Sequence, residues 1–410
     1  MNPLRALWCR AYQIVFRVAL PVLPYTEPQI LGSVEGVADV FAKKGIASVL
    51  LVTDPGIARL GLTRGLEESL DAAGVNVTVY SKTVANPTVD NVEEAAGLYR
   101  SAECQAIIGF GGGSAMDCAK AVGARIAQPN KPVNKMRGLL RVHRRLPLLI
   151  AVPTTAGTGS EVTLAAVITD SATHHTYPIN DFVLIPRYAV HDPRLTIGLP
   201  PAITAQTGMD ALTHAVEAYI GRSTNVYTRA AAVEAVRLIH DNLYQAYLHG
   251  DDEDARRNIL TAAYSAGVAF TRSYVGYVHG IAHSLGGLYG TPHGLANAVI
   301  LPHVLRAYGP TAHAKLAELA RVCGFEGASD AELAGAFIDW VDEMNAKMGI
   351  PAHLDCIREE DIRTMAAHAD AESNPLYPVP VLWDATELAC LYRLVAGSAT
   401  MGAHFSPALS

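Results

Sequence analysis

Residues 106–127 read AIIGFGGGSAMDCAKAVGARIA, an apolar run that ends in three glycines and a serine and then turns alanine-rich. The apolar run predicts a buried β-strand, and Ala115–Ala127 predicts a helix. Glycines between a strand and a helix let backbone N–H groups approach a phosphate closely, and the helix N-terminus favours negative charge. The stretch therefore predicts either a pyrophosphate site at Gly112, Gly113 and Ser114 or a tight turn that needs glycine for its geometry alone.

Short β-rich runs and helical patterns alternate on both sides of this turn. Strand-like runs occupy Ser48–Thr53, Asn76–Tyr80 and Leu146–Val152, and helical patterns lie near Leu62–Ala73 and Val89–Arg100. Such alternation is typical of parallel βαβ units. We therefore predict an α/β domain with a doubly wound, Rossmann-like parallel sheet.

The pattern changes after Gly159. Residues 161–190 predict an extended hairpin with a polar turn at His174–His175, and from Ala202 onward long alanine-rich helical patterns dominate. At 410 residues the chain exceeds the size at which one core keeps growing, and we place a domain boundary near Leu195. The predicted parts are an amphipathic extension (1–31), a dinucleotide-binding α/β domain (32–195) and an all-helical domain (196–410).

A second polar loop follows the next apolar strand. Residues 153–161 read PTTAGTGSE. In an open parallel sheet, neighbouring loops at the carboxyl ends of strands meet over one crevice. We therefore expect the hydroxyls and amides of Thr154, Thr155 and Thr158 to suit contacts with a ribose or a phosphate.

Asp54 ends the Ser48–Thr53 strand. From that position a carboxylate can accept hydrogen bonds from an adenosine ribose and repel a 2′-phosphate, which favours NAD over NADP. The same aspartate could instead cap the turn that begins at Pro55–Gly56. The sequence is compatible with both interpretations.

The second half carries metal-ligating residue types on a helical segment. Residues 208–219 read GMDALTHAVEAY, in which Asp210 and His214 are four residues apart. An i, i+4 pair shares one helix face, so a carboxylate oxygen and an imidazole can point at a single ion.

Three more histidines follow in a short stretch. Residues 278–287 read VHGIAHSLGG and residues 291–294 read TPHG, so His279 and His283 form a second i, i+4 pair and His293 follows a proline-bounded loop. With the aspartate–histidine pair, this constellation predicts one ion with nitrogen and oxygen ligands. Such ligands suit zinc, iron, manganese or cobalt, and no cysteine lies in the cluster to favour a thiolate site.

Composition narrows the class of protein further. The formal net charge is −7 with acids and bases interspersed, which argues against nucleic-acid binding. Six cysteines are scattered without a CxxC pair, so they fit a reducing, cytoplasmic compartment better than a disulfide framework. Half of the residues are hydrophobic, which supports packed interiors rather than long disordered regions.

The N-terminal segment is apolar enough to require a test for a membrane span. Arg17, Pro21 and Pro24 interrupt it, and a span needs about 20 apolar residues, so no transmembrane helix is predicted. Apolar residues recur at helical spacing over Leu4–Val18. We expect this amphipathic helix to dock on its own domain or on a partner subunit rather than on a membrane surface.

In this order, the GGGS turn, PTTAGTGSE, GMDALTHAVEAY and VHGIAHSLGG with TPHGLANA resemble the iron-dependent (group III) alcohol dehydrogenases. The resemblance runs from about Gly32 to about Ala396. It implies a dehydroquinate synthase-like architecture, in which the active site lies between an NAD-binding α/β half and a helical metal half. It also implies hydride transfer between NAD and a small alcohol or aldehyde, one divalent ion, Fe(II) before Zn(II), and a homodimer or higher homo-oligomer.

Matched residue by residue, the resemblance implies a role for each motif position. The four metal ligands fall on Asp210, His214, His279 and His293. His283 falls near the nicotinamide and outside the ligand set, where it could relay the proton. Cofactor contacts fall on Asp54, Asn86, Gly112, Gly113, Ser114, Thr154 and Thr158, of which Asn86 is implied by the resemblance alone.

One position departs from the family pattern. Members usually carry a lysine that reaches the cofactor in the stretch after the Thr169–Asp170 turn, and this chain has Thr176 there. Loss of the ammonium would weaken the hold on the cofactor or transfer its role to another group such as His175.

Three alternative functions follow from these features. A glycerol-type polyol dehydrogenase would share the fold but prefer zinc and a diol. A lyase resembling dehydroquinate synthase would need a basic pocket, and the helical half shows no lysine-rich cluster. Thr176 is the support for a protein that binds NAD and a metal without catalysis.

Overall fold

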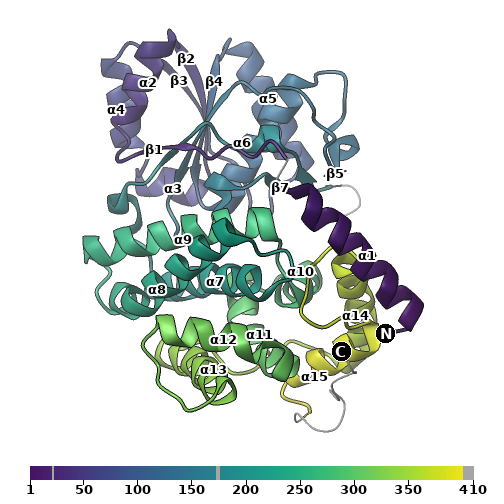
Figure 1. Ribbon diagram of the computed structural model, residues 1–410. Helices are drawn as coiled ribbons and strands as arrows, with labels where there is room; N and C mark the ends of the chain where they lie inside the picture. Colours follow the sequence, from purple (N-terminus) through teal and green to yellow (C-terminus); the bar gives the residue numbers. More distant parts are fainter. Residues whose placement is uncertain (21–22, 172–175, 400–410) are drawn as a thin grey trace. The chain divides into compact units, whose positions relative to one another are not determined.

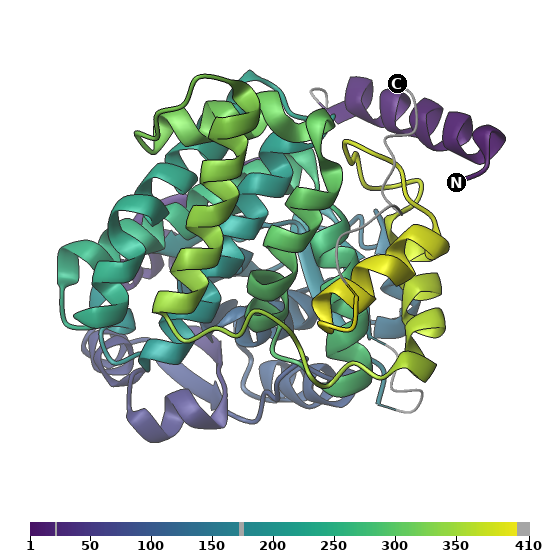
Figure 2. The same ribbon diagram turned by 90° about the horizontal axis from the view of Figure 1, so that it is seen from below.

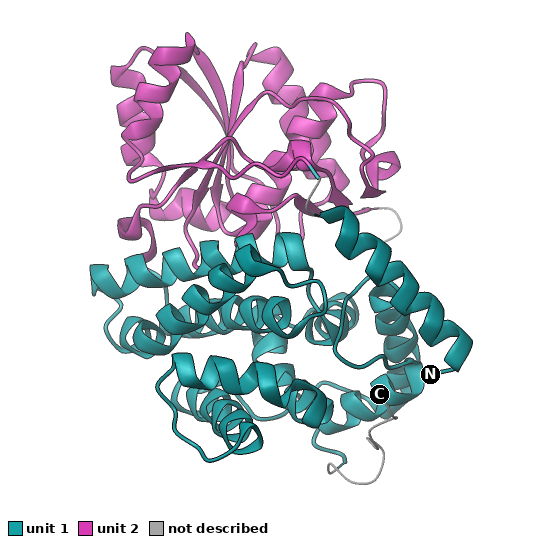
Figure 3. Cartoon of the chain, in the orientation of Figure 1, with its two compact units in different colours: residues 1–23, 199–410 teal, residues 24–198 magenta. Residues whose placement is uncertain are grey.

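The computed structural model describes residues 1–20, 23–171 and 176–399 (Figure 1). The chain forms two compact units, each of which is described by itself (Figure 3). Unit 1 comprises Met1–Leu23 and Leu199–Ser410, and unit 2 comprises Pro24–Gly198.

The bounds of the two units differ in part from the bounds predicted from the sequence. The boundary placed near Leu195 lies close to Gly198, where unit 2 ends. The segment treated as one extension, residues 1–31, is divided, because its helix groups with unit 1 while Gln29–Leu31 forms a strand of unit 2. The polar turn at His174–His175, and with it the role suggested for His175, lies outside the described residues.

Unit 2 contains a six-stranded parallel sheet with the strand order β1-β9-β6-β4-β2-β3. Its strands are β1 (Gln29–Leu31), β2 (Ser48–Val52), β3 (Asn76–Tyr80), β4 (Ala106–Gly111), β6 (Leu148–Pro153) and β9 (Tyr188–Val190). Strand β4 is buried along its whole length, as expected for a parallel strand covered on both faces. The predicted doubly wound, Rossmann-like sheet is confirmed.

Helices cover both faces of this sheet (Figure 1). They are α2 (Gly36–Lys44), α3 (Pro55–Leu60), α4 (Arg64–Ala72), α5 (Val89–Ser101) and α6 (Gly113–Ala127). Because successive strand residues point to opposite faces, Ile107 belongs to the core that includes Val92 of α5, and Ile108 to the core that includes Phe41 of α2.

Unit 2 also contains a three-stranded sheet with the strand order β5-β8-β7. Its strands are β5 (Gly138–Leu139), β7 (Ala165–Thr169) and β8 (Thr176–Asn180), and β7 and β8 pair antiparallel. The predicted hairpin over residues 161–190 is therefore too long, because Tyr188–Val190 joins the parallel sheet instead. Asp181 caps the short helix Phe182–Leu184, and this turn ends the hairpin.

The part of unit 1 that follows residue 198 is helical, as predicted. Its helices are α7 (Pro201–Ile220), α8 (Val226–Leu248), α9 (Glu253–Ser273), α10 (Tyr277–Tyr289), α11 (His293–Tyr308), α12 (Pro310–Val322), α13 (Asp330–Lys347), α14 (Glu359–Ser373) and α15 (Ala385–Val395). Helix α7 is buried on all sides over residues 208–220. A Cβ at Gly208 would lie 2.2 Å from the Leu243 side chain, so this glycine permits close packing of α7 against α8.

Helix α1 (Pro3–Ala19) belongs to unit 1 and packs on α14 and on the segment between α14 and α15 (Figure 2). Its buried residues are Cys9 and Gln13, whereas the apolar stripe over Leu4–Val18 faces away from unit 1 and is exposed. Docking on its own unit agrees with expectation, and the docked face carries Cys9, Gln13 and Phe16 rather than the apolar stripe. Among the described residues, no helix is both long and apolar enough to cross a membrane.

Candidate metal centre and cofactor loops

Four potential ligands from three helices converge in unit 1. Asp210 and His214 come from α7, His279 from α10, and His293 from the first residue of α11. One ligand atom from each lies within 4.8 Å of the others, and His293 alone is only partly buried. Asp210 Oδ1 is 4.0 Å from His214 Nδ1, 3.9 Å from His279 Nε2 and 3.6 Å from His293 Nε2.

Local sequence explains how α11 reaches this point. Pro292 precedes the helix, and His293 is its first residue. A Cβ at Gly294 would lie 2.4 Å from the backbone oxygen of Gln206 in α7, so only glycine permits this close approach. Gly294 therefore allows the start of α11, with His293, to contact the helix that carries Asp210 and His214.

Glu217 orients His279. Its carboxylate accepts hydrogen bonds from Gly276 N at 2.9 Å and Val278 N at 2.8 Å, and its Oε2 lies 2.6 Å from His279 Nδ1. With two backbone donors on the carboxylate, Nδ1 serves as a donor, which leaves Nε2 with a lone pair toward Asp210. Burial raises the pKa of Glu217 to about 7 and holds the pKa of His279 well below its usual value.

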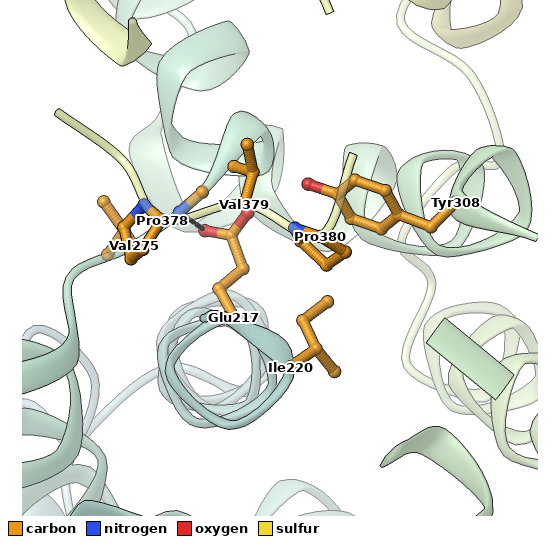
Figure 4. A pocket seen from close by; sticks show the side chains of 9 residues that line it. Glu217, Ile220, Val275, Tyr308, Pro378, Val379 and Pro380 are labelled. Atoms are coloured by element: carbon orange, nitrogen blue, oxygen red, sulfur yellow. Dashed lines mark hydrogen bonds between the residues drawn. The ribbon is translucent and has the colours of Figure 1, made fainter. Parts of the chain in front are cut away.

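A small cavity beside Glu217 shows why this carboxylate has little contact with water (Figure 4). Its lining consists of apolar side chains and backbone apart from Glu217 and the Tyr308 hydroxyl. The lining residues are Glu217, Ile220, Gly221, Val275, Gly276, Tyr308, Pro378, Val379 and Pro380. The apolar surroundings give the physical cause of the raised pKa of Glu217.

Asn297 contacts the same ligand atoms from α11. Its Nδ2 donates to Asp210 Oδ1 at 2.6 Å and lies 3.2 Å from His279 Nε2 and 3.1 Å from His293 Nε2. The Asn297 amide nitrogen thus lies within hydrogen-bond distance of ligand atoms from all three helices.

His283 lies beside the four potential ligands and outside their set. Its ring stacks on His293, with centroids 5.2 Å apart, and its Nδ1 is 2.5 Å from Glu372 Oε1. Tyr377 OH donates to the same carboxylate oxygen at 2.7 Å. Burial acts to lower the pKa of His283, but the Glu372 carboxylate more than offsets it, so the pKa is raised overall.

Sequence reasoning did not single out Glu217, Asn297, Glu372 or Tyr377. A signal existed for two of them, because Glu217 follows Asp210 by seven residues and Asn297 follows His293 by four, and both spacings keep one helix face. Glu372 and Tyr377 are distant in sequence from His283, and the sequence offers no spacing that would connect them.

In unit 2 the glycine turn follows β4 and the second loop follows the neighbouring strand β6. Gly112 is the N-cap of α6 and Gly113 its first residue. A Cβ at Gly113 would lie 3.0 Å from the Thr158 side chain, and one at Gly112 would lie 3.4 Å from Thr155 Oγ1. Thr154 N donates to Gly111 O at 3.0 Å, so the two loops are in direct contact.

Asp54 and Asn86 lie at the same edge of the sheet. Asp54 Oδ1 caps α3 by accepting from Gly56 N at 2.7 Å and Ile57 N at 3.0 Å, so the capping interpretation holds for this oxygen. Its Oδ2 lies next to the glycine turn, 3.3 Å from the position of a Cβ at Gly111. Asn86 has a φ of 55°, and its N–H donates to Ser114 Oγ at 3.3 Å.

A buried lysine anchors the second loop. Lys120 Nζ donates to Ser160 Oγ at 2.9 Å, to Thr163 O at 3.0 Å and to Ala165 O at 2.8 Å. Asp117, which accepts from Ser160 Oγ at 2.7 Å, adds a second contact to the same segment. Sequence reasoning missed both residues, although both belong to the helix that starts at the glycine turn.

Comparison with known proteins identifies the family. A model described as iron-containing alcohol dehydrogenase matches residues 29–193, and a model described as Fe-containing alcohol dehydrogenase family, C-terminal, matches residues 204–393. The chain is 38% identical over 342 residues to Alcohol dehydrogenase 4 of Saccharomyces cerevisiae (strain YJM789), covering 82% of this chain and 88% of that protein. The chain belongs to the iron-containing alcohol dehydrogenase family.

Two further matches extend over similar lengths. The NAD-dependent methanol dehydrogenase of Bacillus methanolicus is 35% identical over 352 residues, covering 84% of this chain and 92% of that protein. A crystal structure of 1,3-propanediol oxidoreductase matches with a TM-score of 0.87 and 37% identity, covering 90% of this chain and 99% of that one. The resemblance inferred from the motifs, the fold class and the assignment to the NAD-linked alcohol dehydrogenases are thereby confirmed.

The departure at Thr176 is visible in this member of the iron-containing alcohol dehydrogenases. Thr176 is the first residue of β8 and is exposed, and its Oγ1 lies 2.9 Å from Thr169 Oγ1 across the pair of strands. The side chain is uncharged, so it does not replace the ammonium of a lysine.

Proposed function

We propose that this iron-containing alcohol dehydrogenase family member oxidises small alcohols or reduces the matching aldehydes with NAD, and that Asp210, His214, His279 and His293 hold its metal ion. The observation that carries the proposal is the convergence of these ligand atoms within 4.8 Å of one another. Three imidazoles and one carboxylate fit a divalent ion such as Fe(II) or Zn(II). We propose Fe(II), in keeping with the family.

A bound ion of this kind acts as a Lewis acid that stabilises negative charge on the substrate oxygen. Glu217 supports the site because its contact with Nδ1 fixes the tautomer and the ring orientation of His279. Asn297 holds Asp210 through the 2.6 Å hydrogen bond to Oδ1. Both residues make the ligand set rigid before substrate arrives.

We assign the proton transfer to His283. In the oxidation direction a bound NAD would supply the hydride acceptor, and the proton of the alcohol oxygen would pass to the His283 imidazole. Glu372 stabilises the imidazolium that results, and Tyr377 holds Glu372 by hydrogen bonding to the same oxygen. In the reduction direction the same imidazole returns the proton.

We assign NAD binding to the loops at the carboxyl ends of β2, β3, β4 and β6. The pyrophosphate would contact the backbone of the glycine turn at the N-terminus of α6, where N–H groups and the helix dipole favour an anion. Asp54 Oδ2 would accept a hydrogen bond from the adenosine ribose. The residues assigned to cofactor binding are Asp54, Asn86, Gly112, Gly113, Ser114, Thr154, Thr155 and Thr158.

The remaining assignments follow the sequence and the family. We propose a homodimer or higher homo-oligomer in the cytoplasm, consistent with scattered cysteines that form no disulfide among the described residues. Small alcohols are favoured as substrates because relatives are named for methanol and 1,3-propanediol.

The test is metal analysis of protein purified without oxygen, paired with NADH oxidation against a panel of short aldehydes and with NAD reduction by alcohols and glycerol. The proposal expects turnover that depends on one metal ion per chain and returns when ferrous iron is added to metal-free protein. A strong preference for zinc and a diol would indicate a polyol dehydrogenase. Bound metal and bound NAD without turnover on any member of the panel would contradict the proposal.

A further inference from the structure

Helix α1 exposes an apolar face that faces away from unit 1. Six large apolar side chains of this helix are between 61% and 79% exposed: Leu4, Leu7, Trp8, Ile14, Val15 and Val18. At 100° per residue they cover an arc of about 120°, in which Ala11 is the other member and no charged residue lies. A continuous apolar face of this kind marks a surface that binds another molecule.

The opposite face of α1 holds the helix in this orientation. Arg5 forms two hydrogen bonds of 2.7 Å with the Asp370 carboxylate, and Arg10 donates to Val379 O and Pro380 O at 2.8 Å. Gln13 donates to Tyr377 O at 2.7 Å. These contacts are specific and largely buried, so rolling the apolar face inward would break all of them.

The charges on α1 favour an anionic occupant. The helix carries three arginines and no acidic residue, although the whole chain has a net charge of −7. Arg5 is paired with Asp370 and Arg10 donates to backbone carbonyls of the same unit, whereas the exposed Arg17 lies at one edge of the apolar face. Trp8 and Tyr12 lie at the other edge, with ring centroids 6.2 Å apart.

The absence of acidic residues from α1 argues against a second copy of the chain as the occupant. Pairing two α1 helices would bring Arg17 of each copy to a helix that offers no acidic partner.

We propose that α1 binds the surface of an anionic lipid bilayer. The apolar side chains enter the head-group region while Arg17 contacts a lipid phosphate, as in interfacial amphipathic helices. The enzyme would then be a peripheral membrane protein that meets its alcohols or aldehydes at the bilayer surface. The proposal replaces the sequence-based expectation that the helix avoids membranes, and it does not depend on the metal or cofactor assignments.

The test is co-sedimentation of the full-length enzyme with vesicles of phosphatidylcholine alone or mixed with phosphatidylglycerol. We expect binding to the mixed vesicles and a blue shift of Trp8 fluorescence, since Trp340 and Trp383 are buried. The double variant Leu7→Glu, Val15→Glu should lose at least about tenfold in bound fraction. The control variant Leu60→Glu, Val226→Glu adds the same charge at residues that are 72% and 88% exposed elsewhere, and it should bind like the unmodified enzyme.

All variants should keep the dehydrogenase rate of the unmodified enzyme without lipid, which shows that they are folded. Absence of binding to the mixed vesicles, or equal binding by the Leu7→Glu, Val15→Glu variant, would overturn the proposal. Equal binding to neutral vesicles would overturn its electrostatic part. A dimer in sedimentation velocity that only this variant loses, without lipid binding, would show that the face joins two copies of the chain.

Discussion

The candidate metal centre of unit 1 and the candidate cofactor loops of unit 2 place their atoms in different ways. In unit 1 the relevant atoms belong to side chains, several of which are held by buried partners, as Glu217 holds His279. In unit 2 many of them are backbone N–H groups at strand ends, and glycines keep the surface open. We therefore expect a single substitution to have a large effect in unit 1 and a smaller effect in unit 2.

The largest effect is expected when a ligand is removed. His279→Ala deletes one of the four potential ligands, so metal content should fall to background and kcat should fall on the order of a thousandfold or more. Metal analysis and steady-state rates measure both. A variant with full metal content and the unmodified rate would remove His279 from the site.

A smaller effect is expected when the partner of a ligand is changed. Glu217→Gln keeps the shape but weakens the hold on His279 Nδ1, so metal affinity should drop roughly 10- to 100-fold. The readout is the Kd for Co(II) followed by its visible absorption, which reports on ligand geometry apart from activity. Glu234→Gln, which alters a contact with Ser265 in the same unit, is the matched control and should leave the Kd unchanged.

A substitution in the glycine turn of unit 2 should affect cofactor binding and no other property of the site. Gly113→Ala places a Cβ 3.0 Å from Thr158 and should raise the KM for NADH roughly tenfold, as expected for loss of about one charge-assisted hydrogen bond. Metal content should not change. Gly97→Ala in α5 has open space around the added Cβ and serves as control. Equal KM values for both variants would argue against a phosphate site at this turn.

The smallest effect is expected at the position that departs from the family. Thr176→Lys adds an exposed ammonium, and an exposed charge pair contributes up to about 1 kcal/mol, so the KM for NADH should fall two- to fivefold at low salt. Raising the ionic strength should remove the gain. If the KM stays the same at low salt, a lysine here does not contact the cofactor in this chain.

Sequence patterns located the strands and the helices that carry the sites, because burial imposes a period of two or a face of i, i+4 residues. The pairs on α7 and α10 follow from the i, i+4 spacing, whereas β4 was predicted from a continuous apolar run and the turn after it from its glycines. The roles assigned to these residues are predictions that the variants above test.

What the sequence did not reveal depends on contacts between distant residues. Glu217 and His279 are 62 residues apart and His283 and Glu372 are 89 apart, so no local pattern connects them. The docked face of α1 could not be predicted for a different reason: amphipathic spacing shows that a helix has two faces, and contacts such as the hydrogen bonds of Arg10 and Gln13 show which face docks. The predicted hairpin over residues 161–190 was too long because the short helix capped by Asp181 ends it.

The most direct test of the central claim is anomalous diffraction at the iron and zinc edges from crystals of the enzyme purified without oxygen. The proposed site predicts one anomalous peak bonded to Asp210, His214, His279 and His293, at about 2.0–2.2 Å from each ligand atom. An anomalous peak bonded to other residues, or a fully active crystal with no peak at these four, would contradict it.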